Sequence, residues 1–373
     1  RIDYTDSADG VLLLEPSRTN LITYSEDFSN SYWTKSGASV TSENAISPDG
    51  SLNASKLVES SLDEQHRLYI TSAINVPSGN VTSSIFVKSA GRNKISIFDF
   101  AWGESWATFN LNDGSVIDTG GVGFINSKIE PMINGFYRIT MSFTPHSGGN
   151  TRMGYHILDD SYTSGTPSGH SYQGDGTSGI YIYGVQLEEG SYATSYIPTS
   201  GSTVQRAAET ANGSGNSEVF NDSEGVLFAD ISLNDDGSSN KRISISDGTN
   251  TNRIVMFFNA NINTYAVSSN GAGSVITNPT NPVQNNKITI SYSGTSVKTY
   301  INGFQIDSST FGGFNSNTLD VLSFANGNLT EPFYGKTKEL GYYDEILTDS
   351  ELEYLTSYRS LSELVTELNL NTL

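Results

Sequence analysis

The sequence predicts an all-β protein: two antiparallel β-sandwich (jelly-roll) domains in tandem, with a short C-terminal helix. Short alternating runs of aromatic and β-branched residues recur along the 373 residues, separated by turns rich in Gly, Asn and Asp. Aromatic residues make up 11% of the chain, which argues against disorder despite its 36 glycines. A chain of this length accommodates two hydrophobic cores more readily than one.

Predicted strands of the first domain lie between glycine- and asparagine-rich turns. They cover residues 54–58, 67–74, 83–88, 94–100, 108–111, 135–143 and 153–158. Residues 112–114 (Asn-Asp-Gly) form a predicted hairpin turn, because Asp-Gly supplies the positive φ that such turns need. A last strand follows the glycine-rich run that begins at Tyr172.

A Ser/Gly/Thr-rich stretch, residues 199–217, separates two strand-rich regions. We therefore expect a first domain over residues 1–209, a linker over 210–224 and a second domain over 225–373. Predicted strands of the second domain cover residues 225–233, 242–246, 253–258, 264–268, 287–292, 297–301 and 318–324.

Local signals also mark a turn and two helices in the second domain. Asn302-Gly303 favours a hairpin turn. Thr348 with Glu351 three residues later is the spacing of a capping box at a helix start. Apolar residues at helical spacing in 361–373 predict a further amphipathic helix.

Composition limits the classes of partner. Forty acidic and 20 basic residues give a net charge of −20, which argues against nucleic acid and against anionic membrane surfaces. No apolar run is long enough to span a membrane. There is no cysteine, so disulfides and thiolate sites are excluded. The chain begins at Arg1, and we expect it to be part of a longer polypeptide.

Several motifs in a fixed order resemble the carbohydrate-binding-module-like jelly roll of bacteriophage tail, tail-spike and head-fibre proteins. They are residues 13–21 (LLEPSRTNL), the pair Phe28 and Trp33, residues 46–50 (ISPDG), 86–92 (FVKSAGR), 109–116 (FNLNDGSV), 135–138 (GFYR) and the glycine-rich block 174–198. Residues 297–303 (VKTYING) and 340–352 (LGYYDEILTDSEL) resemble a concanavalin A-like (laminin-G-like) sandwich. The resemblance implies a virion protein, extracellular when assembled, that contacts other virion proteins and forms a homotrimer.

Aromatic residues beside acids give candidate glycan contacts, because sugar rings stack on aromatic faces while carboxylates hold their hydroxyls. Trp102 and Trp106 flank a glycine turn with Asp99 and Glu104 close by. Tyr172 and Asp175 lie in the loop before the closing strand. Ordinary packing is the competing interpretation for each of these residues.

A structural calcium ion is the one cofactor that the resemblance brings in. Jelly-roll glycan modules often hold such an ion near the first and last strands, which points to Glu26, Asp27 and Glu188. The acidic turn at Asp235 and Asp236 is a second place. Neither matches the EF-hand pattern, and solvated loop acids are the alternative interpretation.

Catalytic motifs are not found. No pair of acids has the context of a glycosidase site, and the nucleophile-elbow, phosphate-loop and zinc-protease patterns are absent. The four histidines are scattered without ligand spacing. We therefore expect a non-enzymatic protein of a phage fibre, spike or tail appendage that binds host cell-surface polysaccharide. The alternatives are an architectural decoration protein without a glycan site and a polysaccharide depolymerase.

Overall fold

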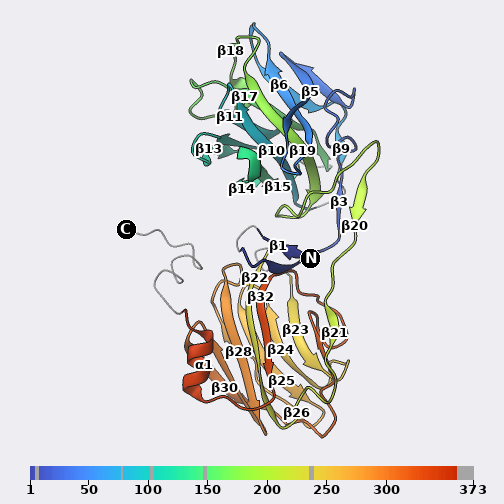
Figure 1. Cartoon of the computed structure of the whole chain (residues 1–373), viewed down its shortest axis with the longest axis vertical. Helices are drawn as coiled ribbons and strands as arrows, with labels where there is room; N and C mark the ends of the chain where they lie inside the picture. The colour runs from blue at the N-terminus through green and yellow to red at the C-terminus, as the bar shows by residue number, and fades with distance from the viewer. Residues whose placement is uncertain (5–7, 77–78, 101–104, 146–148, 235–238, 359–373) are drawn as a thin grey trace. The chain divides into compact units, whose positions relative to one another are not determined.

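The computed structural model describes residues 1–4, 8–76, 79–100, 105–145, 149–234 and 239–358 (Figure 1). The described residues form antiparallel sheets, two single-turn 3-10 helices and one α-helix, α1 (Asp349–Thr356), so the all-β prediction is confirmed. The chain divides into two compact units. Residues 17–207 form the inserted unit, and residues 1–16 together with 208–373 form the split unit.

The inserted unit is built from two six-stranded sheets. In spatial order, the first sheet contains β14 (Phe124–Pro131), β15 (Tyr137–Phe143), β10 (Val81–Ala90), β19 (Gly179–Glu189), β6 (Leu52–Glu59) and β5 (Ala38–Ile46). The second contains β13 (Ser115–Gly120), β12 (Trp106–Asn110), β11 (Lys94–Asp99), β17 (Met153–Leu158), β8 (His66–Ile70) and β4 (Trp33–Ser36).

Three two-stranded ladders complete the inserted unit. They are β16 (Asn150–Thr151) with β9 (Ile74–Asn75), β18 (Tyr172–Gln173) with β7 (Asp63–Glu64), and β20 (Val204–Arg206) with β3 (Arg18–Asn20). The 3-10 helices are η1 (Ile133–Gly135) and η2 (Pro167–Gly169).

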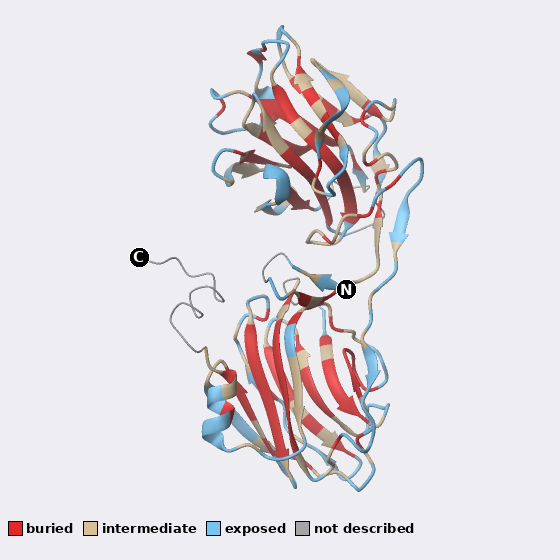
Figure 2. Cartoon of the chain, in the orientation of Figure 1, coloured by how far each residue is buried: buried red, intermediate tan, exposed pale blue. Residues whose placement is uncertain are grey.

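Apolar side chains of the two large sheets meet in one core. Ile85 and Val87 of β10 and Ile95 and Ile97 of β11 belong to the same buried cluster. Trp33 of β4 belongs to the same core, and its side chain is 2% exposed. Figure 2 shows the buried residues concentrated along the strands, with the loops exposed. Alternation along each strand therefore sends every second side chain into the core.

The split unit is a second sandwich. One sheet contains β1 (Ile2–Asp3), β2 (Val11–Leu14), β32 (Gly335–Tyr343), β22 (Glu224–Leu233), β28 (Asn286–Ser293), β29 (Ser296–Ile301) and β30 (Phe304–Thr310). The other contains β21 (Asn212–Ser214), β31 (Val321–Ser323), β23 (Lys241–Ser246), β24 (Arg253–Phe258), β25 (Ile262–Ser268) and β26 (Gly271–Ala272), with β27 (Ile276–Asn278) also paired to β25.

The predicted domain borders differ from the structure at both ends of the first domain. Residues 1–16 join the split unit, because β2 pairs with β32 and Leu14 lies in that unit's core. The predicted linker 210–224 is part of the same unit, since β21 pairs with β31 and Phe220 is buried in its core. An apolar run indicates that its residues pack in a sheet, but it does not indicate which sheet they join.

Local turn and cap signals are confirmed. Gly114 has φ of 69° in the turn between β12 and β13, and Asn302 and Gly303 both have positive φ between β29 and β30. At the start of α1, the Thr348 hydroxyl accepts from the backbone N–H of Glu351, whose carboxylate accepts from the backbone N–H of Thr348. The predicted helix over residues 361–373 lies outside the described residues.

Candidate functional site

The second sheet of the inserted unit turns a set of large side chains away from the core. In β11, Ile95 and Ile97 face the core, so Ser96 and Phe98 face outward. By the same alternation, Trp106 of β12 faces outward, because its neighbour Ala107 lies in the core. The outer face of this sheet therefore carries aromatic residues at positions where an antiparallel sheet usually carries polar ones.

Strand register places these residues in one line across the sheet, which we call the aromatic row. From β13 to β4, the paired residues are Gly120, Trp106, Phe98, Gly154, Tyr69 and Thr34. Trp106 and Tyr69 are three strand spacings apart, about 14 Å between backbones at the usual sheet spacing. The row is thus long enough for a ligand larger than a single ring.

Two glycines of the row hold the rings close to the sheet. A Cβ on Gly120 would lie 2.5 Å from Cζ2 of Trp106, and a Cβ on Gly154 would lie 2.7 Å from Cζ of Phe98. Trp106 also donates from Nε1 to Oδ2 of Asp118 at 3.2 Å. The indole is therefore fixed by a glycine beneath it and by a hydrogen bond at its edge.

Phe100 connects the middle of the row to its far end. Its ring centroid lies 4.3 Å from that of Phe98 and 4.8 Å from that of Tyr69. Phe98 is buried, whereas Trp106, Tyr69 and Phe100 are half-buried and present part of their rings to solvent. Aromatic surface held rigid and partly exposed is what a sugar ring stacks on.

Two arginines stack on the same rings. The Arg152 guanidinium lies 4.8 Å from the Tyr69 centroid, and that of Arg67 lies 5.2 Å from the Phe100 centroid. Asp99 positions Arg152, because its Oδ1 accepts from the Arg152 backbone N–H at 2.8 Å and from the Thr151 hydroxyl at 3.0 Å. Arg152 itself donates from Nε to the carbonyl oxygen of Ile70 at 3.0 Å.

A polar row runs beside the aromatic row. From β13 to β4, its paired residues are Asp118, Thr108, Ser96, His156, Arg67 and Ser36. The loop between β17 and β18 is fastened to this row where Asp118 accepts from the Gly165 backbone N–H at 2.7 Å, and within the loop His170 binds Asp159 at 2.8 Å.

His156 is the exceptional member of the polar row. It is fully buried, and neither ring nitrogen makes a hydrogen bond of normal geometry with a described residue. Burial, with the charges of Arg67, His170 and His66, lowers its pKa to about 3, and only the carbonyl of Pro167 acts in the opposite direction. The imidazole is therefore neutral at ordinary pH and contributes no charge to the site.

The predicted glycan-contact residues fall in three places. Trp106 lies in the aromatic row, and Asp99 supports it from beneath as a buried residue. Trp102 and Glu104 lie outside the described residues. Tyr172 and Asp175 belong to a different part of the unit, and both have structural partners there.

Those partners form what we call the Glu59 network. The Glu59 carboxylate accepts from Arg92 Nη2 at 2.6 Å, from the Tyr172 hydroxyl at 2.7 Å and from the Asp175 backbone N–H at 2.8 Å. Burial alone would raise the pKa of Glu59, but these donors hold it below its ordinary value. The Asp175 side chain in turn accepts from the hydroxyl and backbone N–H of Ser178.

The three carboxylates predicted for calcium have separate partners. Glu26 accepts from the Tyr196 hydroxyl at 2.9 Å, Asp27 accepts from the Ser29 hydroxyl at 2.5 Å, and the fully buried Glu188 accepts from the Thr194 hydroxyl at 2.6 Å. No group of three or more His, Asp or Glu residues suited to a metal occurs in the described part of the chain. Asp235 and Asp236 lie outside that part.

Sequence reasoning missed most of the aromatic row and its arginines. The missed residues are Arg67, Tyr69, Phe98, Phe100, Arg152 and His156. The available signal was the parity of residues 66–70 (HRLYI), where Leu68 and Ile70 are core residues and leave Arg67 and Tyr69 on the outer face. Nothing in the sequence shows that Tyr69 and Trp106 share one register line.

Comparison with known proteins gives remote structural likenesses. No family model and no curated protein sequence matches the chain. Among solved structures, the CBM40 module of Ruminococcus gnavus IT-sialidase bound to α2,3-sialyllactose is 16% identical with TM-score 0.33, covering 40% of this chain and 97% of that one. The same module bound to α2,6-sialyllactose is 15% identical with TM-score 0.33, covering 39% of this chain and 94% of that one. Domains LG4-5 of the mouse laminin α1 chain are 10% identical with TM-score 0.26, covering 76% and 87%.

These similarities are too weak to carry an inference about function.

A separate observation concerns membranes: among the residues that the structure describes, no helix is both long enough and apolar enough to cross one.

Proposed function

We propose that the inserted unit binds a glycan on its aromatic row. The observation that carries the proposal is the register line that brings half-buried Trp106 and Tyr69 to one outward face, with Phe100 and two stacked arginines beside Tyr69. Apolar CH faces of sugars stack on such rings, and guanidinium N–H groups donate to sugar oxygens. Because only part of each ring is exposed, such a surface binds weakly at each copy.

The proposed setting is a bacteriophage fibre, spike or tail appendage that attaches to host cell-surface polysaccharide. The order of motifs over residues 13–198 supports this setting, through its resemblance to phage appendage jelly rolls. Several copies on one particle, in a homotrimer anchored by other virion proteins, would raise weak binding to a useful avidity. We propose a non-enzymatic role, since the aromatic row offers stacking and hydrogen bonds rather than an opposed acid pair.

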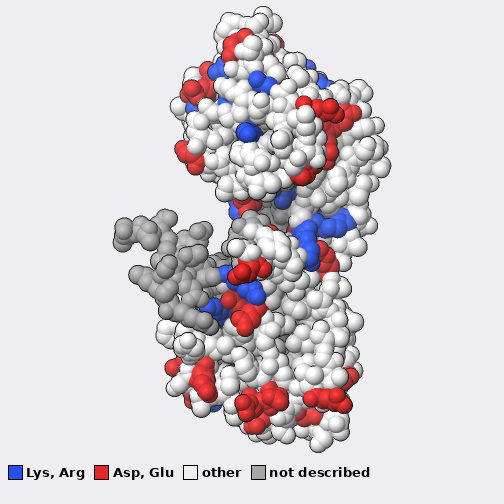
Figure 3. All heavy atoms as spheres, in the orientation of Figure 1, with Lys and Arg blue, Asp and Glu red and all other residues white. Residues whose placement is uncertain are grey.

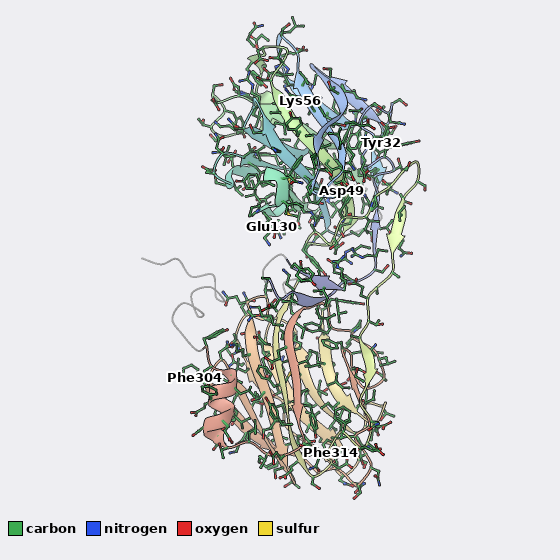
Figure 4. The ribbon with its side chains drawn as sticks, viewed as in Figure 1. Tyr32, Asp49, Lys56, Glu130, Phe304 and Phe314 are labelled. Atoms are coloured by element: carbon green, nitrogen blue, oxygen red, sulfur yellow. The ribbon has the colours of Figure 1, made fainter. Side chains whose placement is uncertain are left out.

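Titration of the chain with host-type oligosaccharides selected on a glycan array tests the proposal. Trp106→Ala and Tyr69→Ala should each weaken binding at least tenfold, because each removes a stacking surface. Phe304→Ala is the matched control: this phenyl ring, labelled in Figure 4, is 72% exposed but lies in the split unit. Equal losses in all three variants, or no binding on the array at any valency, would contradict the proposal.

An architectural part without a glycan site is the alternative. The Glu59 network favours it to the extent that Tyr172 and Asp175 serve the fold alone. Under that alternative, particles that carry Trp106→Ala with Tyr69→Ala adsorb to host cells as the parent does. Under the glycan-binding proposal, their adsorption falls.

A further inference from the structure

The split unit carries a second cluster of cationic and aromatic side chains, on the outer face of β23, β24 and β25. Ile243 and Ile254 face the core, so Arg242 and Arg253, their neighbours along the chain, face outward. Register pairs Arg242 with Phe257, and Tyr265 comes from β25 on the same face. We call Arg242, Arg253, Phe257 and Tyr265 the arginine pair site, and all four are half-buried.

Both guanidinium groups converge on one phenol oxygen. Arg242 donates from Nη1 to the Tyr265 hydroxyl at 2.7 Å, and Arg253 donates from Nη2 to it at 2.9 Å. Arg242 lies 4.2 Å above the Phe257 ring centroid, and Arg253 lies 5.5 Å from that of Tyr265. Since the Tyr265 oxygen already accepts two hydrogen bonds, its own proton is left to donate to a third group.

The charges of the site do not balance. Arg242 has a carboxylate partner, Glu331, which binds its Nε. Burial acts to raise the pKa of Glu331, but Asn240 and Arg242 together lower it, so Glu331 is ionised. Arg253 has no carboxylate within ion-pair distance in the described part of the chain, and its Nε and Nη1 are shielded from solvent with no acceptor. The charge of Arg253 also acts on Glu331, so two cations share one carboxylate and the site carries one excess positive charge.

A buried hydroxyl on the same face is also without a partner. Ser323 is paired with Ser244, which register pairs in turn with Val255 beside Arg253. Ser323 is 1% exposed, and its hydroxyl makes no hydrogen bond with a described residue. Buried donors without a partner are uncommon in folded proteins, and Arg253 (Nε and Nη1) and Ser323 (Oγ) bring three of them to this sheet.

We propose that the arginine pair site binds the carboxylate of an acidic sugar. A carboxylate would accept from the second N–H of Arg253 Nη2, whose first N–H is donated to Tyr265, and from the Tyr265 hydroxyl, which are charge-assisted and neutral donors held side by side. The half-buried faces of Phe257 and Tyr265 provide the apolar surface on which the sugar ring rests. This site lies in a different unit from the aromatic row and does not depend on the proposed function of that row.

Calorimetric titration of the full chain tests the proposal, with a glucuronic acid oligosaccharide and a neutral glucose oligosaccharide of equal length as probes. The chain carries Trp106→Ala and Tyr69→Ala throughout, so that the aromatic row cannot contribute. We expect the acidic probe to bind and the neutral probe to bind at least tenfold more weakly. Equal binding of the two probes would overturn the proposal.

Two variants assign that binding to the site. Arg253→Gln should weaken binding of the acidic probe at least tenfold, and Tyr265→Phe should weaken it severalfold. Lys298→Gln is the matched control, because it removes the same charge from β29, where Lys298 pairs with Asp349. An equal loss in Lys298→Gln would show non-specific attraction and refute the site. Inorganic sulfate that displaces the probe at matched concentration would refute the sugar assignment.

Thermal melting separates a ligand-binding role from a structural one. If Arg253 serves a ligand, Arg253→Gln removes the excess positive charge of the site, and the split unit should melt at the same temperature or higher. If Arg253 serves only to stack on Tyr265, the variant should melt lower while binding of the acidic probe stays unchanged. The second pair of results would overturn the proposal.

Discussion

At the residue scale, Gly120 decides how the Trp106 indole lies. Its φ is not in the left-handed region, so the backbone accepts another residue, but a Cβ would meet two atoms of the indole at 2.5 and 2.6 Å. Gly120→Ala should therefore push the ring off the sheet without unfolding the strand. We expect at least fivefold weaker glycan binding and a changed Trp fluorescence, measured by titration.

Gly169→Ala is the control for that substitution, since nothing lies within 4 Å of its Cβ position. It should leave both binding and fluorescence unchanged. Glycan affinity that survives Gly120→Ala would mean that the indole face is not the contact surface.

His156 gives the inserted unit a dependence on pH. Its pKa is about 3 in the folded state and about 6.5 when exposed, so the unfolded chain takes up the proton first. Stability from this group is complete above pH 6.5 and falls by about 1.4 kcal/mol per pH unit between there and pH 3. His156→Leu should remove that slope, which urea unfolding at pH 7 and pH 5 measures. An unchanged difference between the two pH values would contradict the assignment.

At the scale of elements, the Glu59 network fastens the loop after β18 to the end of β6. Glu59 is 2% exposed and fully bonded, so its charge is tolerable only while Arg92 stays. Arg92→Met should cost the inserted unit about 3 kcal/mol, because it leaves a buried carboxylate without its cation.

A double substitution checks that explanation of the Arg92→Met loss. Glu59→Gln with Arg92→Met should recover most of the lost stability, because the uncompensated charge is gone. Denaturant unfolding of the two single variants and the double variant gives the coupling between the two residues. Strictly additive losses would mean that the pair interacts little.

One face of the molecule is sparsely charged for so acidic a chain (Figure 3). On the face that Figure 3 shows, most atoms belong to uncharged residues, and acidic groups gather in separate patches. Many carboxylates are bound to hydroxyl and amide donors within their own turns, as Asp175 and Asp247 are. The loops therefore use their acids mainly to hold turns in shape.

At the scale of the whole molecule, a continuous unit is inserted into a split one. Glu15 and Glu209 bond to each other next to the two points where the chain passes between the units. The Glu209 backbone N–H donates to the carbonyl of Glu15, and the Glu15 backbone N–H donates to the Glu209 carboxylate. β3 and β20 then pair as the chain enters and leaves the inserted unit.

The split unit therefore depends on residues far from its remainder in sequence. Leu14 is 2% exposed in its core, so Leu14→Ala should cost that unit about 2–5 kcal/mol. Scanning calorimetry should show a lower melting temperature for the split unit and an unchanged melting temperature for the inserted unit. Leu57→Ala, a fully buried leucine of the inserted core, should do the reverse. A shift of both transitions by either variant would mean that the two units unfold together.

Sequence reasoning succeeded where the determinant is local. Alternating apolar residues specify strands, Asp113-Gly114 and Asn302-Gly303 specify turns, and Thr348 with Glu351 specifies a helix start, because each signal acts over a few residues. It did not find the partners of Tyr172 and Asp175, because Glu59 and Arg92 lie at least 80 residues away along the chain.

The amino-acid sequence alone determined that this protein is all-β, where most of its strands and turns lie, and which charge it carries. Only the tertiary structure decided that Val11–Leu14 completes the sheet of the split unit and that Trp106, Phe98 and Tyr69 stand in one line. The physical reason is that strand pairing joins residues without regard to their separation along the chain, whereas turns and caps depend on immediate neighbours.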